Sequence, residues 1–349
     1  MTLPRLTRSL LERLPKAELH CHLDGSVRPS TLLELGREYG VAMPRDDAES
    51  LREYMIVRDA HNLEEYLARF QTTLSVMQTA ESLERIAYEL ASDAAREGVW
   101  YLEVRFAPNL NTRSGLSSAQ AIEAALRGLT SAEREYGIVS RVLVCALRTL
   151  PPSSSMEMAR LAVDFHGRGV VGFDLAGAEY GNPASAHAQA FGYARAHDLP
   201  CTCHAGEGAG AGSVRDAVHA CCASRIGHGT RLIEDAELTD FVNDRRIAVE
   251  VCLTSNVQTR ATASLETHPL PEYLRRGLNV VLNTDNRLMS GTTLTDEYHV
   301  ASQNLGLGFD DLARMALNGF ESAFLPWNER LALLARAREA IDALRGPVS

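Results

Sequence analysis

Two histidines separated by a single residue lie near the start of the chain, in the segment Glu18-Leu-His-Cys-His-Leu-Asp-Gly25. The residues before them predict a β-strand that ends at His22, and residues two apart in a strand point to the same face. His20 and His22 could therefore bind one metal ion, since imidazole is a common metal ligand. Alone, such a pair is a weak indication, because a single histidine is more often a core or surface residue.

Three further clusters of ionisable residues follow apolar, strand-like runs. They are Cys203-His204-Ala-Gly-Glu207, Arg225-Ile-Gly-His228-Gly229 and Asn283-Thr-Asp285-Asn286. If the strands are parallel, their carboxyl ends lie on one side of the sheet, where barrel enzymes carry their active sites. Each cluster alone could be a strand end capped by hydrogen bonds, but the clusters together predict one functional site.

The residue types in these clusters favour a zinc site that holds one ion per subunit. His20, His22 and His204 would supply imidazole ligands and Asp285 a carboxylate, a set that suits Zn²⁺ better than Mg²⁺ or Ca²⁺. Ligand type alone leaves Fe²⁺, Co²⁺ and Mn²⁺ open. Zinc lowers the pKa of bound water to about 7, so a hydroxide nucleophile would exist at neutral pH.

The other ionisable groups fit hydrolysis at an electrophilic carbon. Glu207 lies three residues beyond His204 and can transfer protons as a general acid and base. His228 can orient the attacking hydroxide, and Asp285 can accept a proton from the water while it binds the metal. Glu207, His228 and Asp285 are therefore the predicted catalytic residues.

Short β-branched runs alternate with longer segments of helical periodicity. This alternation predicts a parallel sheet with helical crossovers, and eight such units predict a closed (β/α)8 TIM barrel of the α/β class. An open doubly wound sheet is the alternative, but no glycine fingerprint follows the first strand. The expected strands are Ala17–His22, Val99–Phe106, Ser140–Leu147, Val170–Ala176, Pro200–His204, Arg225–His228, Ala248–Cys252 and Asn279–Thr284. The expected helices include Ser82–Glu97, Ser118–Tyr136, Ser155–Gly167, Ser185–His197, Gly212–Cys222 and Ile233–Asp244.

The segment from Arg28 to about Thr79 departs from this alternation, because its pattern is helical and no second strand follows until Val99. We expect residues 1–349 to form one metal-dependent hydrolase domain, in which residues 28–79 are an extra helical insertion after the first strand, over the barrel mouth. The alternative is that this segment extends the outer helical layer.

Composition favours a cytoplasmic enzyme that acts on a small molecule. The 349 residues carry a formal net charge of −10, whereas nucleic-acid binding requires clustered Lys and Arg. The first 15 residues lack the apolar core of a signal peptide, and no apolar run approaches the roughly 20 residues of a membrane span. Seven cysteines, an odd number without zinc-finger spacing, predict reduced thiols in the core, including Cys201, Cys203, Cys221 and Cys222. The oligomeric state stays open.

Taken together, these motifs resemble the adenosine deaminase family of the amidohydrolase superfamily. The resemblance extends from Pro15 to about Leu333, and the motifs are highly specific as an ordered set. The family is a zinc-dependent barrel, which agrees with the interpretation of the residues given above. The matching motifs are Pro15-Lys-Ala-Glu-Leu-His-Cys-His-Leu-Asp-Gly25, Asp174-Leu-Ala-Gly177, His204-Ala-Gly-Glu207, Arg225-Ile-Gly-His228-Gly229, Cys252-Leu-Thr-Ser-Asn256 and Asn283-Thr-Asp285.

The resemblance implies catalytic roles in the deamination of an adenine ring. Glu207 matches the acid that protonates purine N1 and so makes C6 electrophilic. His228 matches the residue that steers hydroxide onto C6, after which ammonia leaves and a 6-oxo purine remains. The positions that match the family's zinc ligands are His20, His22, His204 and Asp285.

The resemblance also implies substrate contacts, with one departure. The backbone N–H of Gly177 matches the partner of purine N3, and Asp24 matches a residue near a ribose hydroxyl. Many members carry a second Asp after the metal-binding Asp, and its protonated carboxyl group donates to purine N7. This chain has Asn286 there, whose amide donates at any pH. The predicted substrate-binding residues are Asp24, Gly177, Asn286 and His22.

The expected substrate is adenosine or 2′-deoxyadenosine, with inosine or 2′-deoxyinosine as product. Because Asn286 departs from the common pattern, 6-aminodeoxyfutalosine, an intermediate of menaquinone biosynthesis, and adenine are the alternatives. We expect the sugar to lie near Arg58, Asn62 and Phe70 and near residues 105–111. A hydrolase of another class would be favoured by a lysine at the end of a middle strand, and an inactive binding protein by loss of Glu207 or a ligand; neither feature occurs.

Overall fold

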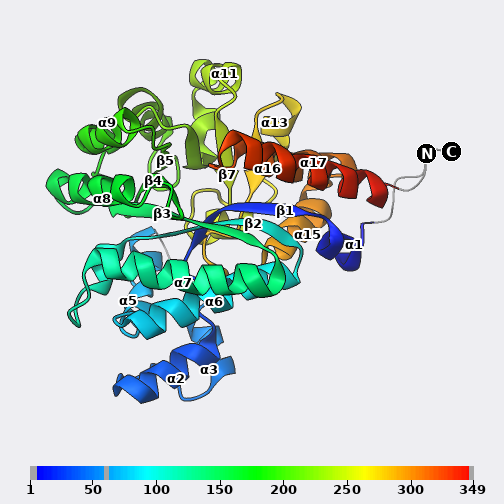
Figure 1. The fold of residues 1–349 in the computed structure, drawn as a ribbon. Helices are drawn as coiled ribbons and strands as arrows, with labels where there is room; N and C mark the ends of the chain where they lie inside the picture. The colour runs from blue at the N-terminus through cyan, green and yellow to red at the C-terminus, as the bar shows by residue number, and fades with distance from the viewer. Residues whose placement is uncertain (1–5, 59–62, 346–349) are drawn as a thin grey trace.

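Parallel strands form a closed barrel at the centre of the computed structural model, and helices surround them (Figure 1). The structure describes residues 6–58 and 63–345. Within these residues the strands are β1 (Lys16–His22), β2 (Val99–Phe106), β3 (Val139–Leu147), β4 (Val170–Ala176), β5 (Thr202–Ala205), β6 (Arg225–His228), β7 (Ala248–Val251) and β8 (Val280–Leu282). The predicted TIM barrel is confirmed, and the open doubly wound sheet is wrong.

The barrel consists of two four-stranded ladders, β1–β2–β3–β4 and β5–β6–β7–β8, which meet at two seams. At the seam between β8 and β1, the backbone N–H of Asp285 donates to the carbonyl of His20 (2.9 Å), and that of His22 donates to the carbonyl of Asp285 (2.7 Å). At the seam between β4 and β5, the N–H of Phe173 donates to the carbonyl of Pro200 (3.1 Å). Each seam is thus a single isolated β-bridge, whereas neighbouring strands within each half pair over several residues, with register shifts in the β1–β2 and β3–β4 pairs.

Strand β8 ends at Leu282, two residues before the predicted end, because a side chain replaces the ladder there. The Oδ1 atom of Asn283 accepts hydrogen bonds from the backbone N–H groups of Leu19 (2.7 Å) and His20 (3.1 Å). The chain then turns at Asp285, whose φ is 62°. This turn brings the Asp285 side chain over the barrel mouth.

Helices on the outside of the barrel follow the predicted pattern. For example, α7 (Ser118–Tyr136) begins after a capping box formed by Ser117 and Gln120, and it ends at Gly137, whose φ of 72° suits glycine. No described helix is long and apolar enough to cross a membrane. The other helices outside residues 28–79 are α1 (Arg8–Arg13), α6 (Ala80–Arg96), α8 (Pro152–Asp164), α9 (Ala188–Ala196), α10 (Ala211–Arg215), α11 (Ala236–Asp244), α12 (Leu253–Gln258), α13 (Leu270–Arg275), α14 (Arg287–Ser290), α15 (Leu294–Leu305), α16 (Phe309–Ser322) and α17 (Trp327–Leu344).

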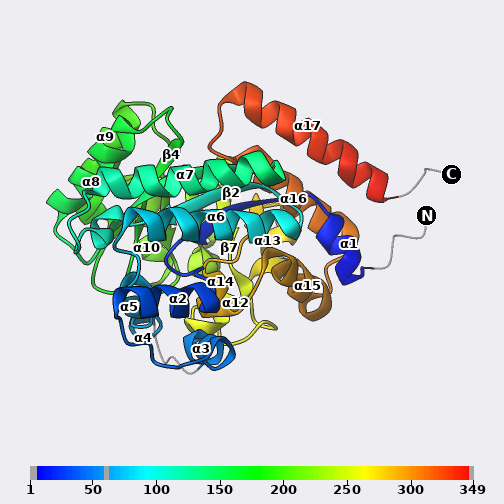
Figure 2. The same ribbon diagram turned by 60° about the horizontal axis from the view of Figure 1, so that its bottom comes forward.

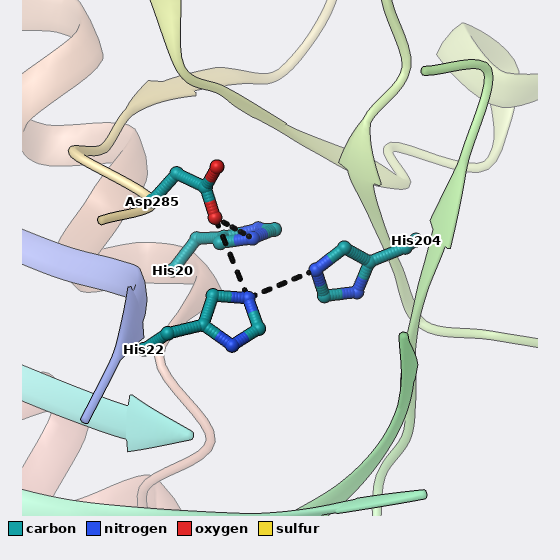
Figure 3. Close-up of side chains that lie close together, drawn as sticks. All are labelled: His20, His22, His204 and Asp285. Atoms are coloured by element: carbon teal, nitrogen blue, oxygen red, sulfur yellow. Dashed lines mark hydrogen bonds and ion pairs between the residues drawn. The ribbon is translucent and has the colours of Figure 1, made fainter. Parts of the chain in front are cut away.

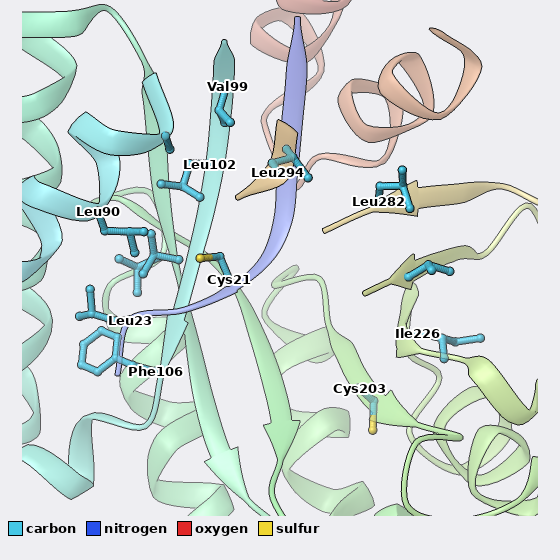
Figure 4. Packing of buried hydrophobic residues seen from close by; sticks show 14 of the residues in the cluster. Cys21, Leu23, Leu90, Val99, Leu102, Phe106, Cys203, Ile226, Leu282 and Leu294 are labelled. Carbon is cyan, nitrogen blue, oxygen red and sulfur yellow. The ribbon is translucent and has the colours of Figure 1, made fainter. Parts of the chain in front are cut away.

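Apolar side chains on the outer face of the strands pack against these helices (Figure 4). Leu102 and Phe106 of β2 lie in the same buried cluster as Leu90 of α6 and Cys21 of β1. The spacing of four residues between Leu102 and Phe106 keeps both on one face of the strand. Full burial of such a side chain contributes about 1.5–3 kcal/mol, so this layer holds the helices on the barrel.

Charged side chains fill the barrel interior below the mouth. Arg105 donates to Asp174 (3.0 Å) and to Glu250 (2.9 Å), and Arg225 donates to Glu250 (2.6 Å) and to Glu103. All of these side chains are buried. Loss of one partner would leave a buried charge without compensation, which typically costs about 3–5 kcal/mol. This network therefore forms a rigid floor below the barrel mouth.

Four helices lie between β1 and α6: α2 (Pro29–Tyr39), α3 (Ala48–Met55), α4 (Leu63–Leu67) and α5 (Phe70–Leu74). Figure 2 shows them at one end of the barrel, next to α12 and α14. The N–H of Val57 donates to the carbonyl of Met289 (3.0 Å), and the Tyr66 hydroxyl lies 3.1 Å from that of Ser290. The segment thus packs on the turn after β8, at the carboxyl ends of the strands.

The prediction that the cysteines lie in the core needs one correction. Six of the seven cysteines are buried, and all seven are free thiols. Cys222 is exposed, because it lies in the turn before β6, where its φ of 50° directs the chain away from the preceding helical segment. The expectation of a core position is therefore wrong for Cys222.

Candidate metal centre and active site

Four predicted ligand residues converge at the carboxyl end of the barrel (Figure 3). His20 and His22 extend from β1, His204 from β5, and Asp285 from the turn after β8. Nε2 of His22 lies 3.1 Å from Nε2 of His204 and 3.4 Å from Oδ1 of Asp285. Nε2 of His20 lies 3.3 Å from the same Asp285 oxygen. Side chains 265 positions apart in the sequence thus meet at one point.

This spacing fits a site in which all four side chains bind one metal ion. Zinc–ligand bonds of about 2.0–2.1 Å place neighbouring ligand atoms roughly 3.3 Å apart. Nε2 of His20 is buried and has no hydrogen-bond partner among the described residues. Since buried polar atoms are normally paired, this nitrogen is available to a cation. The donor set of three imidazoles and one carboxylate therefore fits a divalent metal such as zinc.

Two buried carboxylates orient the imidazole rings. Nδ1 of His20 lies 2.9 Å from Glu250, and Nδ1 of His204 lies 3.2 Å from Asp174. Because a carboxylate accepts hydrogen bonds, Nδ1 of each ring carries the proton and the lone pair of Nε2 faces the other ligands. The buried charge network of the barrel thus sets the tautomers that metal binding requires.

His228 and Asp285 adopt left-handed backbone conformations, with φ values of 63° and 62°. This region is unfavourable for residues other than glycine, and such strained residues gather at functional sites. Both side chains are held by hydrogen bonds: Oδ2 of Asp285 accepts from the Ser255 hydroxyl (2.6 Å), and Nδ1 of His228 lies 3.0 Å from Nδ2 of Asn256. The backbone conformation directs both side chains toward the same cavity, and these hydrogen bonds hold them there.

Glu207 lies in the loop after β5, where its Oε2 is 3.4 Å from Nε2 of His228. Burial, together with the charges of Asp285 and Glu179, raises the pKa of Glu207 well above its ordinary value. Its Oε1 is buried and lacks a hydrogen-bond partner among the described residues. A carboxyl group that keeps its proton and has a free oxygen can act as a general acid. Burial also lowers the pKa of His228, so that imidazole is neutral.

The loop that carries Glu207 is held by a single carboxylate. Oε1 of Glu179 accepts a hydrogen bond from the N–H of Gly206 (2.7 Å). Its Oε2 accepts from the N–H groups of Glu207 (2.9 Å), Gly208 (2.6 Å) and Ala209 (3.1 Å). Four successive backbone donors on one carboxylate fix the path of the loop, and hence the position of the Glu207 side chain.

A cavity of about 270 Å³ opens beside the four ligand residues. The polar side of its lining includes His22, Asp24, Gly177 and Asn286, the residues predicted to contact substrate. The apolar side comes from α4, α5, the loop after β2 and the end of β3, and it includes Leu63, Leu67, Phe70, Leu74, Leu110 and Leu147. Apolar walls with a few polar groups are typical of small-molecule sites.

Two polar side chains of the lining have an oxygen that could accept a hydrogen bond from a ligand. Oδ1 of Asp24 and Oδ1 of Asn286 are buried without a hydrogen-bond partner among the described residues. Burial raises the pKa of Asp24 to about 7. Gly177 has a φ of 99°, a conformation that suits glycine, where the chain leaves β4. Polar groups of a ligand can therefore approach all three positions.

The predicted sugar-facing residues are only partly found at the cavity. Phe70 and Leu110 line it. Arg58 does not, because its side chain is exposed and lies 3.8 Å from a glutamate of α3. Arg105 also does not, because it is buried in the ion network inside the barrel. Asn62 lies outside the described residues.

Residues that hold the site in place were missed by sequence reasoning. Asp174 belongs to a quoted motif, but its contact with His204 was not predicted; Glu250 and Asp174 are single acids within buried strands, a signal that could have marked both as partners of the ligand histidines. Asn256 belongs to a quoted motif, but its contact with His228 joins positions 28 apart, and no local pattern reveals it. Glu179 lies outside the quoted motifs, and its contacts join it to residues 27 to 30 positions away.

Comparison with known proteins agrees with this site. The family model for adenosine deaminase matches residues 15–340. A protein from Mycobacterium avium named adenosine deaminase is 41% identical, and the alignment covers 96% of each chain. A relative at this level of identity and coverage shares the family and its class of activity, so the chain is a hydrolytic deaminase.

Solved structures with the same fold give a consistent picture. An adenine deaminase from Arthrobacter aurescens has a TM-score of 0.87 at 28% identity, over 94% of this chain and 99% of that one. An amidohydrolase from Burkholderia ambifaria, solved with bound zinc, has a TM-score of 0.88 at 26% identity, over 98% and 95% of the two chains. An Arabidopsis ADAL structure in complex with IMP has a TM-score of 0.85 at 30% identity, over 95% and 98%. This chain belongs to the adenosine deaminase family.

Proposed function

We propose that the chain is a zinc-dependent adenosine deaminase that converts adenosine and 2′-deoxyadenosine into inosine and 2′-deoxyinosine and releases ammonia. The convergence of three imidazoles and Asp285 beside a carboxyl group that keeps its proton carries this proposal. The Mycobacterium avium relative bears the same name, and the Burkholderia ambifaria structure contains zinc, which support the substrate and the metal. In this proposal His20, His22, His204 and Asp285 hold one zinc ion per subunit.

The catalytic residues divide the proton transfers between them. When bound, zinc would lower the pKa of a water molecule to about 7 and so supply a hydroxide nucleophile. Asp285 takes the proton of the attacking water. Glu207 gives its proton to purine N1, which makes C6 electrophilic, and His228 directs the hydroxide onto C6. Asp285 then passes the proton that it took from the water to the amino group, the C6–N bond breaks, and ammonia leaves. As the C6 carbonyl forms, the proton of the C6 hydroxyl returns to Glu207.

Three residues of the cavity lining orient the substrate in this proposal. The amide of Asn286 donates to purine N7, and the backbone N–H of Gly177 donates to N3. Asp24 receives a ribose hydroxyl. Their positions on the polar side of the cavity support these contacts, and Oδ1 of Asp24 has no hydrogen-bond partner among the described residues.

The charge of the lining favours a nucleoside over a nucleotide. Among the described residues that line the cavity there is no Lys or Arg, whereas Asp24, Glu207 and Asp285 are acids. A phosphate group would have no cation to pair with there. The Arabidopsis ADAL structure contains the nucleotide IMP, so this chain would differ from that protein in substrate.

The second candidate is deamination of adenine or of 6-aminodeoxyfutalosine. The adenine deaminase from Arthrobacter aurescens shares the fold, and Asn286 replaces the common second Asp. In either case residues 1–349 would act as one catalytic domain, and residues 28–79 would be an insertion over the barrel mouth. The contribution of α4 and α5 to the cavity wall supports that role for the insertion.

A substrate panel tests the proposal. Purified protein loaded with zinc is mixed with adenosine, 2′-deoxyadenosine, adenine, 6-aminodeoxyfutalosine and AMP, and the loss of the adenine absorption band is recorded. We expect rapid turnover of the two adenosine nucleosides and little turnover of AMP. Turnover of only 6-aminodeoxyfutalosine or only adenine would contradict the proposed substrate and identify that compound as the substrate instead.

A further inference from the structure

A chain of three hydrogen bonds links His228 to the start of α13. Nδ1 of His228 lies 3.0 Å from Nδ2 of Asn256, and Oδ1 of Asn256 lies 3.1 Å from Nε2 of His268. Nδ1 of His268 lies 3.0 Å from the backbone N of Leu270. All three side chains are buried, so water does not compete for these bonds. This series of hydrogen bonds connects the end of β6 with α12 and with α13, which precedes β8.

The backbone N–H of Leu270 gives this chain a direction. A backbone N–H can only donate, so Nδ1 of His268 must accept. Burial lowers the pKa of His268 to about 4, and the neutral ring therefore carries its single proton on Nε2. Nε2–H then donates to Oδ1 of Asn256, and the amide Nδ2–H of Asn256 donates to Nδ1 of His228.

The opposite orientation of Asn256 would bring donors face to face. With its amide turned around, Nδ2–H would meet Nε2–H of His268. Moving the His268 proton to Nδ1 would not help, because that nitrogen already faces the N–H of Leu270. A buried donor without an acceptor costs about 1–3 kcal/mol. The observed orientation therefore satisfies every member of the chain.

We propose that Asn256 and His268 are positioning residues that fix the tautomer of His228, so that its Nε2 carries the proton on the cavity side. Nδ1 of His228 accepts from Asn256, which leaves Nε2 as the donor. Nε2 lies 3.4 Å from Oε2 of Glu207 and borders the cavity. His228 thus donates a hydrogen bond to the attacking oxygen and to the negative charge that forms on it, and it does not remove a proton. This consequence rests on the proposed function, but the tautomer itself does not.

Nitrogen NMR of the zinc-loaded protein tests the tautomer directly. The histidines are labelled with ¹⁵N, and His228 is assigned by comparison with His228→Asn. We expect a protonated Nε2 and an unprotonated Nδ1 on His228. A protonated Nδ1 in the wild-type protein would overturn the proposal, and this measurement needs no variant of Asn256 and no substrate.

Two substitutions of Asn256 then separate tautomer control from packing. Asp has the shape of Asn but only accepts, so Asn256→Asp should move the His228 proton to Nδ1. The cation bound beside His228 disfavours a positive charge on the ring, so the ring keeps only the proton on Nδ1 and Nε2 loses its proton. We expect kcat to fall by about 10²–10⁴-fold with a much smaller change in KM, since a positioned proton-bearing side chain contributes about this much to the rate. Asn256→Ala imposes no tautomer and should lose less.

The kcat values of the two variants distinguish tautomer control from packing: tautomer control predicts a lower kcat for Asn256→Asp than for Asn256→Ala. A merely structural role predicts the reverse order, because Asp fills the space of Asn and Ala leaves a cavity. Asn318→Asp is the matched control: Asn318 is a buried amide that donates to the carbonyl of Val280 (3.0 Å), and its loss should leave the His228 spectrum unchanged. If Asn256→Asp does not fold, the wild-type spectrum decides. If wild-type protein deaminates none of the adenine compounds, the proposed function fails while the spectrum still tests the tautomer.

Discussion

Glu207 has two properties of a general acid: a raised pKa, and an oxygen beside the cavity that has no hydrogen-bond partner among the described residues. Gln has the same shape but cannot give up a proton. We expect Glu207→Gln to lower kcat by about 10²–10⁴-fold, the usual contribution of proton transfer by a positioned side chain. The four metal ligands are unchanged, so the zinc content should stay near one per subunit. Steady-state kinetics and metal analysis on the same preparation measure both quantities.

Glu297→Gln provides the control for this experiment. Burial also raises the pKa of Glu297, to about 7, but this residue contacts Thr254 and Thr292 and is not among the described residues that line the cavity. Its substitution should leave kcat within about threefold of wild type, since a change of side chain outside the site alters no contact with the transition state. A near-normal kcat for Glu207→Gln would exclude Glu207 as the proton donor.

Asn286 allows a test of how purine N7 is recognised. Asn286→Ala should lower kcat/KM for adenosine by about 10–100-fold, because a hydrogen bond from a buried amide is lost. Asn286→Asp should retain more activity where its carboxyl group is protonated, and its kcat/KM relative to wild type should fall as the pH rises and the carboxyl group loses the proton it donates. Kinetics of all three proteins across the same pH range measure this. Equal pH profiles for Asn286→Asp and wild type would show that residue 286 does not donate to the base.

At the level of elements, the loop after β5 depends on Glu179. Glu179→Gln replaces one acceptor oxygen by an NH₂ group, which would face a backbone N–H of residues 206–209. Hydrogen bonds to a charged group contribute about 1.5–3 kcal/mol each, so the loop should loosen. We expect faster hydrogen exchange in this loop and a kcat at least about tenfold lower, with unchanged zinc content because His204 belongs to β5 itself. Exchange measured by mass spectrometry reports the loop, and kinetics report its effect on Glu207.

Glu234→Gln is the matched control, because Glu234 accepts a hydrogen bond from the nearby N–H of Ala211 (3.3 Å) and is half-exposed. Its substitution should change neither the exchange of residues 206–209 nor kcat. If Glu179→Gln behaves like this control, the carboxylate does not hold the loop, and the position of Glu207 must come from other contacts.

The elements and the ligand set could be predicted from the sequence because their signals are local. β2 and β6 match their predicted bounds, and His20, His22, His204 and Asp285 follow from strand ends that must share one rim. The supporting contacts could not be predicted in this way. Glu179 reaches residues 27 to 30 positions away, and Asn256 reaches His228, so both depend on how neighbouring units pack.

The whole barrel is divided into two halves, and the metal ligands come from both of them. His20, His22 and Asp285 lie at the seam between β8 and β1, where two backbone hydrogen bonds join the halves. His204 lies on β5, the strand at the other seam. A metal ion held by these four residues would therefore tie both seams together. This coupling makes metal binding a contribution to the stability of the barrel as well as to catalysis.

Removal of the metal should consequently loosen the seams before the rest of the molecule. A ligand present at about 1,000 times its Kd stabilises the folded state by about 4 kcal/mol, and exhaustive chelation withdraws that contribution. We expect hydrogen exchange to accelerate first in residues 16–22, 200–205 and 280–285, while α7, which packs far from the ligands on the outer layer, serves as the internal reference. His20→Ala should already exchange at the chelated rate and respond little to chelator. Uniform acceleration across the barrel, or none, would show that the ion does not join the two halves.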